Sequence, residues 1–385
     1  MNKKLLVASV GAWALFCGLT YLFIDPNISY LTILYSGFAG EHRIVSSLFF
    51  LLIISLQFLI YFYCLNKLTS LRYIKIIGGV CISLLLLAYP AMLSYDLFNY
   101  MTMAKLLFYY GENPYVVMPI EIIGEPYLLF THFANTTTIY GPIWTLLSGI
   151  PHFLGFNTFI GGILGFKLLS ACALVIISII IWKLTNSIKN TVFFLLNPLV
   201  LIELVGSGHN DGVMMVFALL SFFFIQRKRY VLAFSCILLS IGIKFATIII
   251  FPIILYAIIQ ELRGKKVGYT RLYGISFLCM FFVFSISFLR VEVYPWYAVW
   301  FLSFASLLPW NRLFHGTLIS ITIGLMLRYL PFMLTGTHFG LTPVLRMVLM
   351  CIPVIGWYLV EIVKHKLNRA TVHKAWVNML ELRHK

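Results

Sequence analysis

Two carboxylates stand out in this chain because they lie where long apolar segments end. The sequence has three aspartates, and two of them fall in the runs LSYDLFNY (Asp96) and GHND (Asp211). A charged group at the centre of a bilayer costs roughly 2.5–3.5 kcal/mol even on a lenient insertion scale. A carboxylate kept in such a setting is therefore a candidate for function. We expect these two to belong to an enzyme that works at the membrane surface.

The composition identifies the class of protein. Apolar residues make up 61% of the chain, charged residues 10%, and the mean hydropathy is +0.97, whereas soluble domains are about 45–50% apolar and about 25% charged. We predict an all-α, polytopic transmembrane helical bundle in one domain, residues 1–362. The apolar run from Leu5 to Phe23 is too long for a signal peptide and predicts an uncleaved first span. The seven cysteines form no CxxC pair, so neither disulfides nor a zinc site is expected.

Apolar segments of sufficient length predict about twelve spans, since about 20 residues cross the hydrocarbon core. Several segments have only 14–16 residues, and short helices are tolerated where their ends lie in a cavity formed by protein. The predicted spans are 5–24, 44–65, 74–94, 160–182, 191–206, 212–226, 230–244, 246–260, 271–290, 296–310, 313–334 and 342–362.

The distribution of Lys and Arg predicts the orientation. With the N-terminus inside, 21 of the 28 basic residues fall in cytoplasmic segments, including the tail 363–385, and seven fall outside. Both termini are then cytoplasmic in a multi-pass cell-membrane protein, and Asp96, Asp211 and Lys244 all emerge on the external face. The net charge of +16 reflects this orientation and not nucleic-acid binding. Counting 139–157 as a span would invert everything after it, so we interpret that segment as a re-entrant or interfacial helix.

The longest external segment, 95–140, carries the first carboxylate. Residues 97–108 place apolar side chains on one helical face, which predicts an amphipathic helix lying in the membrane interface. Asp96 could serve only as the N-cap of this helix, although capping and catalysis are compatible. Pro114 ends the helix, and the remainder up to 140 is expected to form an irregular external cap.

An ordered series of motifs resembles a known family. The series comprises SYD at 94–96 with Tyr100, GENPY at 111–115, YGPIW at 140–144, NPLVL at 197–201, GHND at 208–211 with Met214 and Met215, Lys244, and PWY at 295–297 with Trp300. It resembles the pattern of bacterial polyprenol-phosphate-mannose-dependent α-mannosyltransferases, which belong to the GT-C superfamily of membrane glycosyltransferases. The motifs run in order from about 94 to 300, and the chain beyond Trp300 has no recognisable motif.

The resemblance implies a reaction and its partners. A hexose, mannose in the family, would pass with inversion from a polyprenyl-phosphate donor to a hydroxyl of a cell-envelope glycan or glycolipid at the external face of the bilayer. Asp96 would act as the base, and Lys244 would face the donor phosphate. His209 and Asp211 are too few ligands for a metal site, so no cofactor is expected. The predicted catalytic residues are Asp96 and Asp211, and the predicted substrate-binding residues are Tyr100, Asn113, Tyr115, Tyr140, His209, Asn210, Lys244, Arg290, Trp296 and Tyr297.

The same residues also fit purely structural roles. Asn210 or Asp211 could simply cap the helix 212–226, and the aromatic residues 296–300 could belong to an ordinary interfacial belt. Arg290, Arg328 and Arg346 could be snorkelling interface residues. For the whole chain, a transporter or flippase of polyprenyl-linked sugars and an O-antigen polymerase or ligase are the alternatives. A transporter needs polar groups near the bilayer midplane, whereas the candidates here cluster at one predicted face.

Overall fold

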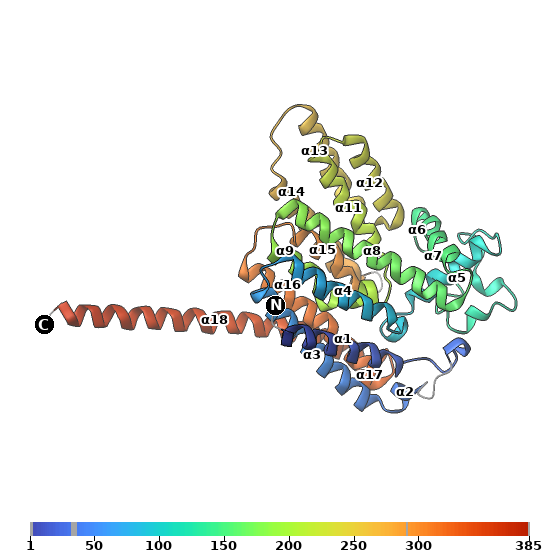
Figure 1. Cartoon of the computed structure of the whole chain (residues 1–385), viewed down its shortest axis with the longest axis horizontal. Helices are drawn as coiled ribbons and strands as arrows, with labels where there is room; N and C mark the ends of the chain where they lie inside the picture. Colours follow the sequence, from blue (N-terminus) through green and yellow to red (C-terminus); the bar gives the residue numbers. More distant parts are fainter. Residues whose placement is uncertain (1–2, 32–36, 290–291, 384–385) are drawn as a thin grey trace. The chain divides into compact units, whose positions relative to one another are not determined.

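The computed structural model describes residues 3–31, 37–289 and 292–383, and these residues contain helices and no β-strand (Figure 1). The chain divides into two compact units, 1–309 and 310–385. The long helices of the first unit are α1 (Lys3–Tyr21), α3 (Arg43–Lys67), α4 (Leu71–Leu87), α5 (Asp96–Phe108), α8 (Phe159–Thr185), α11 (Asp211–Ile225), α12 (Tyr230–Ile243), α13 (Phe251–Leu262) and α14 (Tyr269–Ile286).

Short helices connect the long ones in the first unit. They are η1 (Ser29–Leu31), α2 (Phe38–Glu41), η2 (Pro90–Met92), η3 (Pro119–Glu121), η4 (Pro126–Leu129), α6 (Pro142–Leu147), α7 (Gly149–Leu154), α9 (Ile188–Leu195), α10 (Pro198–Leu201), η5 (Ile202–Gly206), η6 (Phe245–Ile250), η7 (Ser287–Leu289), η8 (Pro295–Tyr297) and α15 (Ala298–Ala305). Many of them start at proline, whose fixed φ suits the first helical turn.

The helical segments agree with the predicted ones in position, but fewer are long enough to cross a membrane. Among the described residues, seven helices have the length and apolar character of a span, or eight if the bent pair Ile188–Leu195 and Pro198–Gly206 counts as one. The helix in the predicted span 296–310, α15, has eight residues, all of them buried. The count of about twelve spans is therefore not confirmed.

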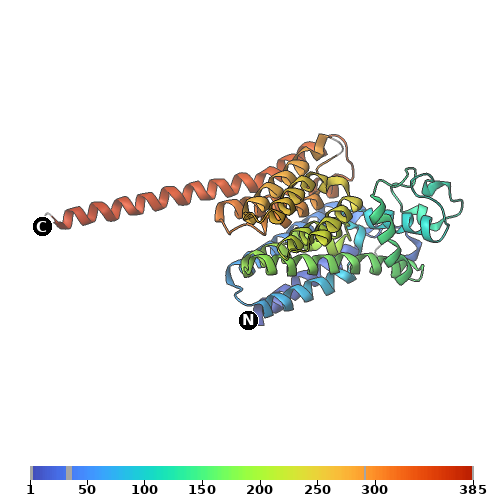
Figure 2. The same ribbon diagram turned by 90° about the horizontal axis from the view of Figure 1, so that it is seen from above.

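Several helix ends of the first unit meet at the same place. Tyr21 at the end of α1 donates a 2.5 Å hydrogen bond to the carbonyl of Leu87 at the end of α4. Lys167, in the first half of α8, donates to the carbonyl of Ala88, the residue after α4. Figures 1 and 2 both place the segment 96–157 at this end of α8, with the N-terminus towards the other end. Asp96, the first residue of α5, thus lies at this end of the helices.

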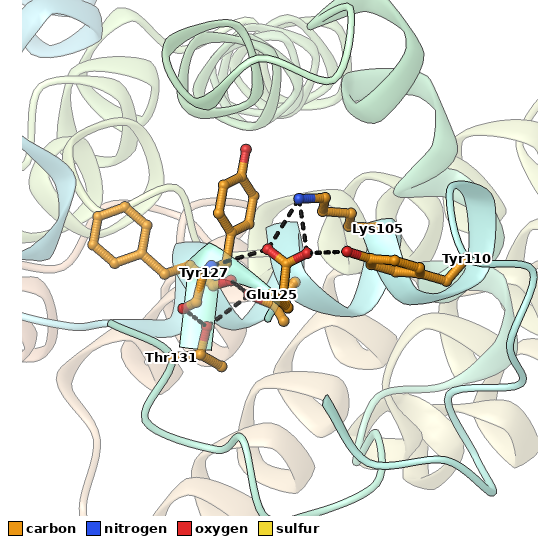
Figure 3. A network of polar contacts seen from close by, with 7 residues as sticks. Lys105, Tyr110, Glu125, Tyr127 and Thr131 are labelled. Atoms are coloured by element: carbon orange, nitrogen blue, oxygen red, sulfur yellow. Dashed lines mark hydrogen bonds and ion pairs between the residues drawn. The ribbon is translucent and has the colours of Figure 1, made fainter. Parts of the chain in front are cut away.

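The segment between α5 and α6 is anchored to α5 by a buried ion pair. Glu125 accepts hydrogen bonds from Lys105 Nζ at 2.9 Å and from Tyr110 Oη at 2.6 Å (Figure 3). A second link joins the hydroxyls of Thr102 and Thr131 at 2.7 Å. Since only 2% of the Glu125 side chain is exposed, loss of either partner would leave a buried charge. The segment therefore holds α5, and with it Asp96, in place.

The helix predicted for 97–108 is present as α5, but protein covers most of its surface, including polar side chains. Nine of its 13 residues are buried, including the polar residues Asn99 and Thr102. The segment after α5 and the helices α7 and α8 cover it. The polar residues of α5 therefore pack against protein, and its placement relative to the membrane stays a prediction.

The segment 139–157 forms two six-residue helices, α6 and α7, instead of one. Pro142 occupies the first position of α6, where its fixed φ suits the first helical turn. Each helix is only about 9 Å long at 1.5 Å per residue, which is too short to cross a bilayer. The side chains of Leu146, Phe153 and Leu154 are more than 60% exposed.

The second unit consists of α16 (Arg312–Leu327), α17 (Leu330–Thr335) and α18 (Thr342–Arg383). Gly316 and Gly324 of α16 allow α18 to approach closely. A Cβ on Gly324 would lie 2.1 Å from the carbonyl oxygen of Met350, and one on Gly316 would lie 2.1 Å from the ring of Trp357. Arg312 forms a 2.7 Å ion pair with Glu361. Arg328 and Arg346 belong to this unit. Helix α18 continues through residue 363, where the tail was predicted to start, and the predicted domain boundaries stay a prediction.

The predicted orientation can be tested by cysteine labelling. In a cysteine-free background, single cysteines at Glu112 and Thr337 should react with a membrane-impermeant maleimide on intact cells. Cysteines at Lys228 and Lys265 should react only after permeabilisation, because basic connections remain on the cytoplasmic side. All four side chains are exposed. If 139–157 crossed the membrane, Lys228 would label from outside and Thr337 would not, which would contradict the orientation.

Candidate active site

Asp96 is the first residue of α5, and its carboxylate faces His209. The cap position before it belongs to Tyr95, and the Asp96 amide donates to Ser94 Oγ at 3.2 Å. Oδ2 of Asp96 lies 3.5 Å from Nδ1 of His209, and 18% of the Asp96 side chain is exposed. Asp96 is therefore not an N-cap, and the interpretation as a cap alone is wrong. Its position in the first turn lets the helix dipole stabilise the carboxylate.

A second carboxylate, Glu203, contacts the other side of the same ring. Its Oε2 lies 3.3 Å from Nε2 of His209, and both side chains are fully buried. Glu203 lies in η5, a π-helical turn of which every residue is buried. Single π-turns inside helices are frequent at functional sites. Glu203 is absent from the residues predicted from the sequence because 191–206 was treated as a membrane span, although a carboxylate inside that apolar run is itself a signal.

The protonation of His209 follows from these contacts. Burial alone would lower the pKa of the imidazole, but hydrogen bonding and charge from Asp96 and Glu203 outweigh it and raise the pKa to about 9. At neutral pH the ring is thus an imidazolium that can donate from both nitrogens. The ring of Trp296 stacks on it with centroids 4.1 Å apart and 17° between the planes, so the nitrogens at the ring edge remain for the two carboxylates.

Asp211 forms the second charged pair of the site. It is the first residue of α11, is fully buried, and accepts hydrogen bonds on Oδ1 from Lys244 Nζ at 2.9 Å and from Trp300 Nε1 at 2.5 Å. Asn210 precedes it at the cap position and makes no side-chain cap bond. Asp211 itself lies inside the helix, so capping does not account for the buried Asp211 carboxylate. The Lys244 side chain is 21% exposed, which leaves its ammonium able to meet a further ligand.

Two tyrosines lie between the pairs. The rings of Tyr100 and Tyr140 are 4.9 Å apart, and both side chains are buried. Burial and then the negative charges of Asp96 and Asp211 raise the pKa of each hydroxyl well above its ordinary value. Both tyrosines therefore stay neutral donors close to the two aspartates, and they join the two halves into one site.

Aromatic rings cover the charged groups. Lys244 Nζ lies 4.7 Å from the ring centroid of Tyr297, which in turn stacks on Trp300 at 4.1 Å. Such cation–π contacts stabilise an ammonium by about 0.5–2 kcal/mol. Trp296 and Trp300 are largely buried and contact charged residues. These residues are therefore not an ordinary lipid-facing belt.

Close backbone contacts bring the site segments together. Gly208 has φ +75°, and a Cβ there would lie 2.5 Å from Cδ1 of Leu97, the residue after Asp96. The amide of Gly141 donates to the carbonyl of Ile243 at 3.1 Å, and a Cβ on Gly141 would lie 2.2 Å from the carbonyl oxygen of Gly242. The first contact places His209 beside Asp96, and the second places Lys244 beside Tyr140.

The remaining predicted residues lie farther out or outside the described residues. Asn113 is exposed and accepts from the amide of Tyr115 at 3.0 Å in a turn, so its side chain is not placed at the charged groups. Tyr115 supports the site indirectly, because its hydroxyl donates to the carbonyl of Tyr140 at 2.9 Å. Arg290 is not among the residues that the structure describes. Within the described ranges, no set of three His, Cys, Asp or Glu side chains has the arrangement of a metal site.

Comparison with known proteins finds similarity to α-(1→6)-mannopyranosyltransferases, both in a family model and in individual relatives. A family model described as "Alpha-(1->6)-mannopyranosyltransferase, N-terminal domain" matches residues 32–260. Two similar proteins are both named alpha-(1->6)-mannopyranosyltransferase A: one from Mycobacterium tuberculosis, 27% identical over 197 residues, and one from Corynebacterium glutamicum, 25% identical over 180 residues. The alignments cover 48% and 45% of this chain but only 36% of each relative, so the chain matches about a third of their length. No solved structure matches.

The contact between Gly208 and Leu97 leads to a stability prediction. Gly208→Ala should lower the thermal midpoint of the purified protein more than Gly111→Ala, a matched control. Both glycines have φ +75°, but nothing lies within 4 Å of a Cβ on Gly111. The control should therefore lose only the roughly 1–2 kcal/mol of a left-handed backbone. In a Leu97→Ala background, the two glycine variants should lose equal stability. An extra loss that persists there would contradict the proposed contact.

Proposed function

Since the chain belongs to the MptA/MptB family of α-(1→6)-mannopyranosyltransferases, we propose that it is a membrane mannosyltransferase. It takes mannose from a polyprenyl-phosphate donor and transfers it to a hydroxyl of a cell-envelope glycan or glycolipid at the external face. The observation that carries this proposal is the pairing of a partly exposed carboxylate, Asp96, with a partly exposed ammonium, Lys244, in one site. Transfer from a lipid phosphate needs both groups.

The carboxylate serves the attacking group. The acceptor hydroxyl forms a bond to the anomeric carbon of mannose while the bond from that carbon to the phosphate oxygen breaks. The hydroxyl proton passes to the carboxylate of Asp96, which is the more exposed of the two carboxylates that contact His209. A positioned base contributes typically 10²–10⁴-fold to such a step. Attack from the side opposite the phosphate gives inversion.

The ammonium serves the leaving group. Polyprenyl phosphate departs with an additional negative charge, and no acid is needed if a cation lies beside it. Lys244 has three N–H groups, and Asp211 Oδ1 receives one of them. Trp300 donates to the same oxygen, so Asp211 keeps a partner when the lysine turns to the phosphate. Tyr297 lies against the ammonium and offers a face on which sugar or prenyl carbon can pack.

The position of the charged groups favours a transferase over a transporter. Asp96, Asp211 and Lys244 lie at the first residues of α5 and α11 and just after the last residue of α12. The basic connection 227–229 lies at the other ends of α11 and α12, next to residues 225 and 230. This arrangement, with the positive-inside rule, supports an external site and cytoplasmic termini. A transporter site would lie near the middle of the helices.

Asp96→Asn should abolish transfer, because the amide keeps the size of the side chain but cannot accept the proton. Purified protein in liposomes would receive radiolabelled polyprenyl-phosphate mannose, with envelope glycolipids as acceptor. We expect a loss of at least about 100-fold, with Glu112→Gln, an exposed carboxylate change, as active control. Retention of a tenth or more of the activity would remove Asp96 as base. Equal transfer from nucleotide-linked mannose would contradict the donor.

Lys244→Ala should weaken donor binding more than acceptor binding, because the charge facing the phosphate is lost. A hydrogen bond to a charged group contributes about 1.5–3 kcal/mol, so the donor KM should rise roughly 10–100-fold. Lys244→Arg should be only partly tolerated, since its planar fork differs from a point charge. Lys265→Ala, in an exposed connection, is the control. An unchanged donor KM in correctly folded Lys244→Ala would exclude the lysine from phosphate binding.

A further inference from the structure

Glu203 is a buried carboxylate that has no task in the proposed transfer step. The four other residues of its π-turn, Ile202, Leu204, Val205 and Gly206, are uncharged, and the whole turn is buried. Removing a carboxylate from water costs several kcal/mol unless a cation compensates it. The cation at hand is His209, whose Nε2 lies 3.3 Å from Glu203 Oε2. A buried pair of this kind adds little net stability. Stability alone therefore does not account for Glu203.

The backbone of residues 202–209 folds back so that His209 contacts Glu203. The amide of Ser207 donates to the carbonyl of Ile202 at 2.8 Å, which is the wide spacing of a π-turn, and the amide of His209 donates to the carbonyl of Glu203 at 3.2 Å. Gly208 supplies the left-handed conformation between them. Ser170 Oγ also donates to the carbonyl of His209, at 3.4 Å. Both the main chain and the side chain of His209 are thus held against Glu203.

The same ring reaches the exposed carboxylate. Nδ1 of His209 lies 3.5 Å from Asp96 Oδ2, so the imidazole stands between one fully buried carboxylate and one that is 18% exposed. A neutral imidazole has one N–H, and only the imidazolium has a donor for each carboxylate. A single ring can therefore hold Asp96 and satisfy Glu203 only in its protonated form.

We propose that Glu203 is a positioning residue that keeps His209 an imidazolium, so that its second N–H orients Asp96 for proton transfer. This inference rests on the proposed transferase function. In the transfer step the acceptor proton goes to Asp96, His209 keeps both of its protons, and Glu203 stays an anion. The three groups change from a net charge of −1 to zero, so the reaction neutralises the negative charge of the trio and creates no new charge there.

The groups around His209 are consistent with this role. Asp96 faces it from α5, Glu203 from η5 and Trp296 from η8, while Asp211 and Lys244 form their own pair. Asp96 and Glu203 together raise the pKa of His209 to about 9 against the effect of burial. The imidazolium is therefore fully present below the ordinary His value of about 6.5 and is lost as the pH rises through about 9.

The test is the pH dependence of kcat/KM in Glu203→Gln, which keeps the size of the side chain and removes its charge. In the wild type, activity should fall on the alkaline side near pH 9. In the variant, this fall should occur about one to three pH units lower, the usual effect of one opposite charge, while much of the activity at pH 6 remains. Glu203→Asp should restore the alkaline limit in part. Glu112→Gln, an exposed carboxylate change, should leave the profile unchanged.

A second measurement does not depend on turnover. In protein with 15N-labelled histidine, the signal that His209→Gln removes should titrate near pH 9 in the wild type and at lower pH in Glu203→Gln or, if that variant does not fold, in Glu203→Asp. A shifted titration without transfer from any mannosyl donor would overturn the proposed function and leave the pairing intact. The role of Glu203 would be overturned if Glu203→Gln transferred mannose and His209 still titrated as in the wild type. It would also be overturned if the variant lost the same fraction of activity at every pH.

Discussion

The need to pair the buried charges of the candidate site is the constraint on which this part of the first unit depends. Asp211, Glu203 and His209 are fully buried among apolar helices, and Asp96 and Lys244 are mostly so. Each charge would cost several kcal/mol if left alone. Because Asp96 lies far from His209 in the sequence and Asp211 far from Lys244, their pairing requires the starts of α5 and α11, the π-turn η5 and the end of α12 to meet at one place. The short helices and sharp turns around the site follow from this requirement.

The arrangement explains why glycine, proline and a π-turn concentrate there. Gly208 and Gly141 provide contacts that no side chain would fit, and η5 places a carboxylate and a histidine on the same side of the chain. Such local features cost stability unless the surrounding packing enforces them. The segment between α5 and α6 contributes to that packing through the ion pair of Glu125 with Lys105, which holds α5 in place (Figure 3).

The sequence predicted the individual charged residues better than it predicted their partners. Asp96, Asp211 and Lys244 were recognisable because charges at the ends of apolar segments need a reason, and the motif series indicated a family that the match over 32–260 confirms. Glu203 was not predicted because residues 191–206 were assigned to a membrane span. The hydrophobic pattern of that segment does not distinguish a π-turn from an α-helix. The role of Trp300 as a donor to Asp211 depends on contact across 89 residues, which sequence spacing does not reveal. The burial of α5 likewise depends on a segment folded over it, so amphipathic pattern alone gave the wrong surroundings.

The most direct test of the proposed site is an experimental density map of the protein bound to a non-hydrolysable phosphonate analogue of polyprenyl-phosphate mannose. We expect the phosphonate about 3 Å from Lys244 Nζ, with the anomeric carbon facing the space beside Asp96 and His209 between Asp96 and Glu203. A ligand bound elsewhere, or an Asp96 carboxylate separated from His209 and remote from the anomeric carbon, would contradict the claim that these charges form one transferase site.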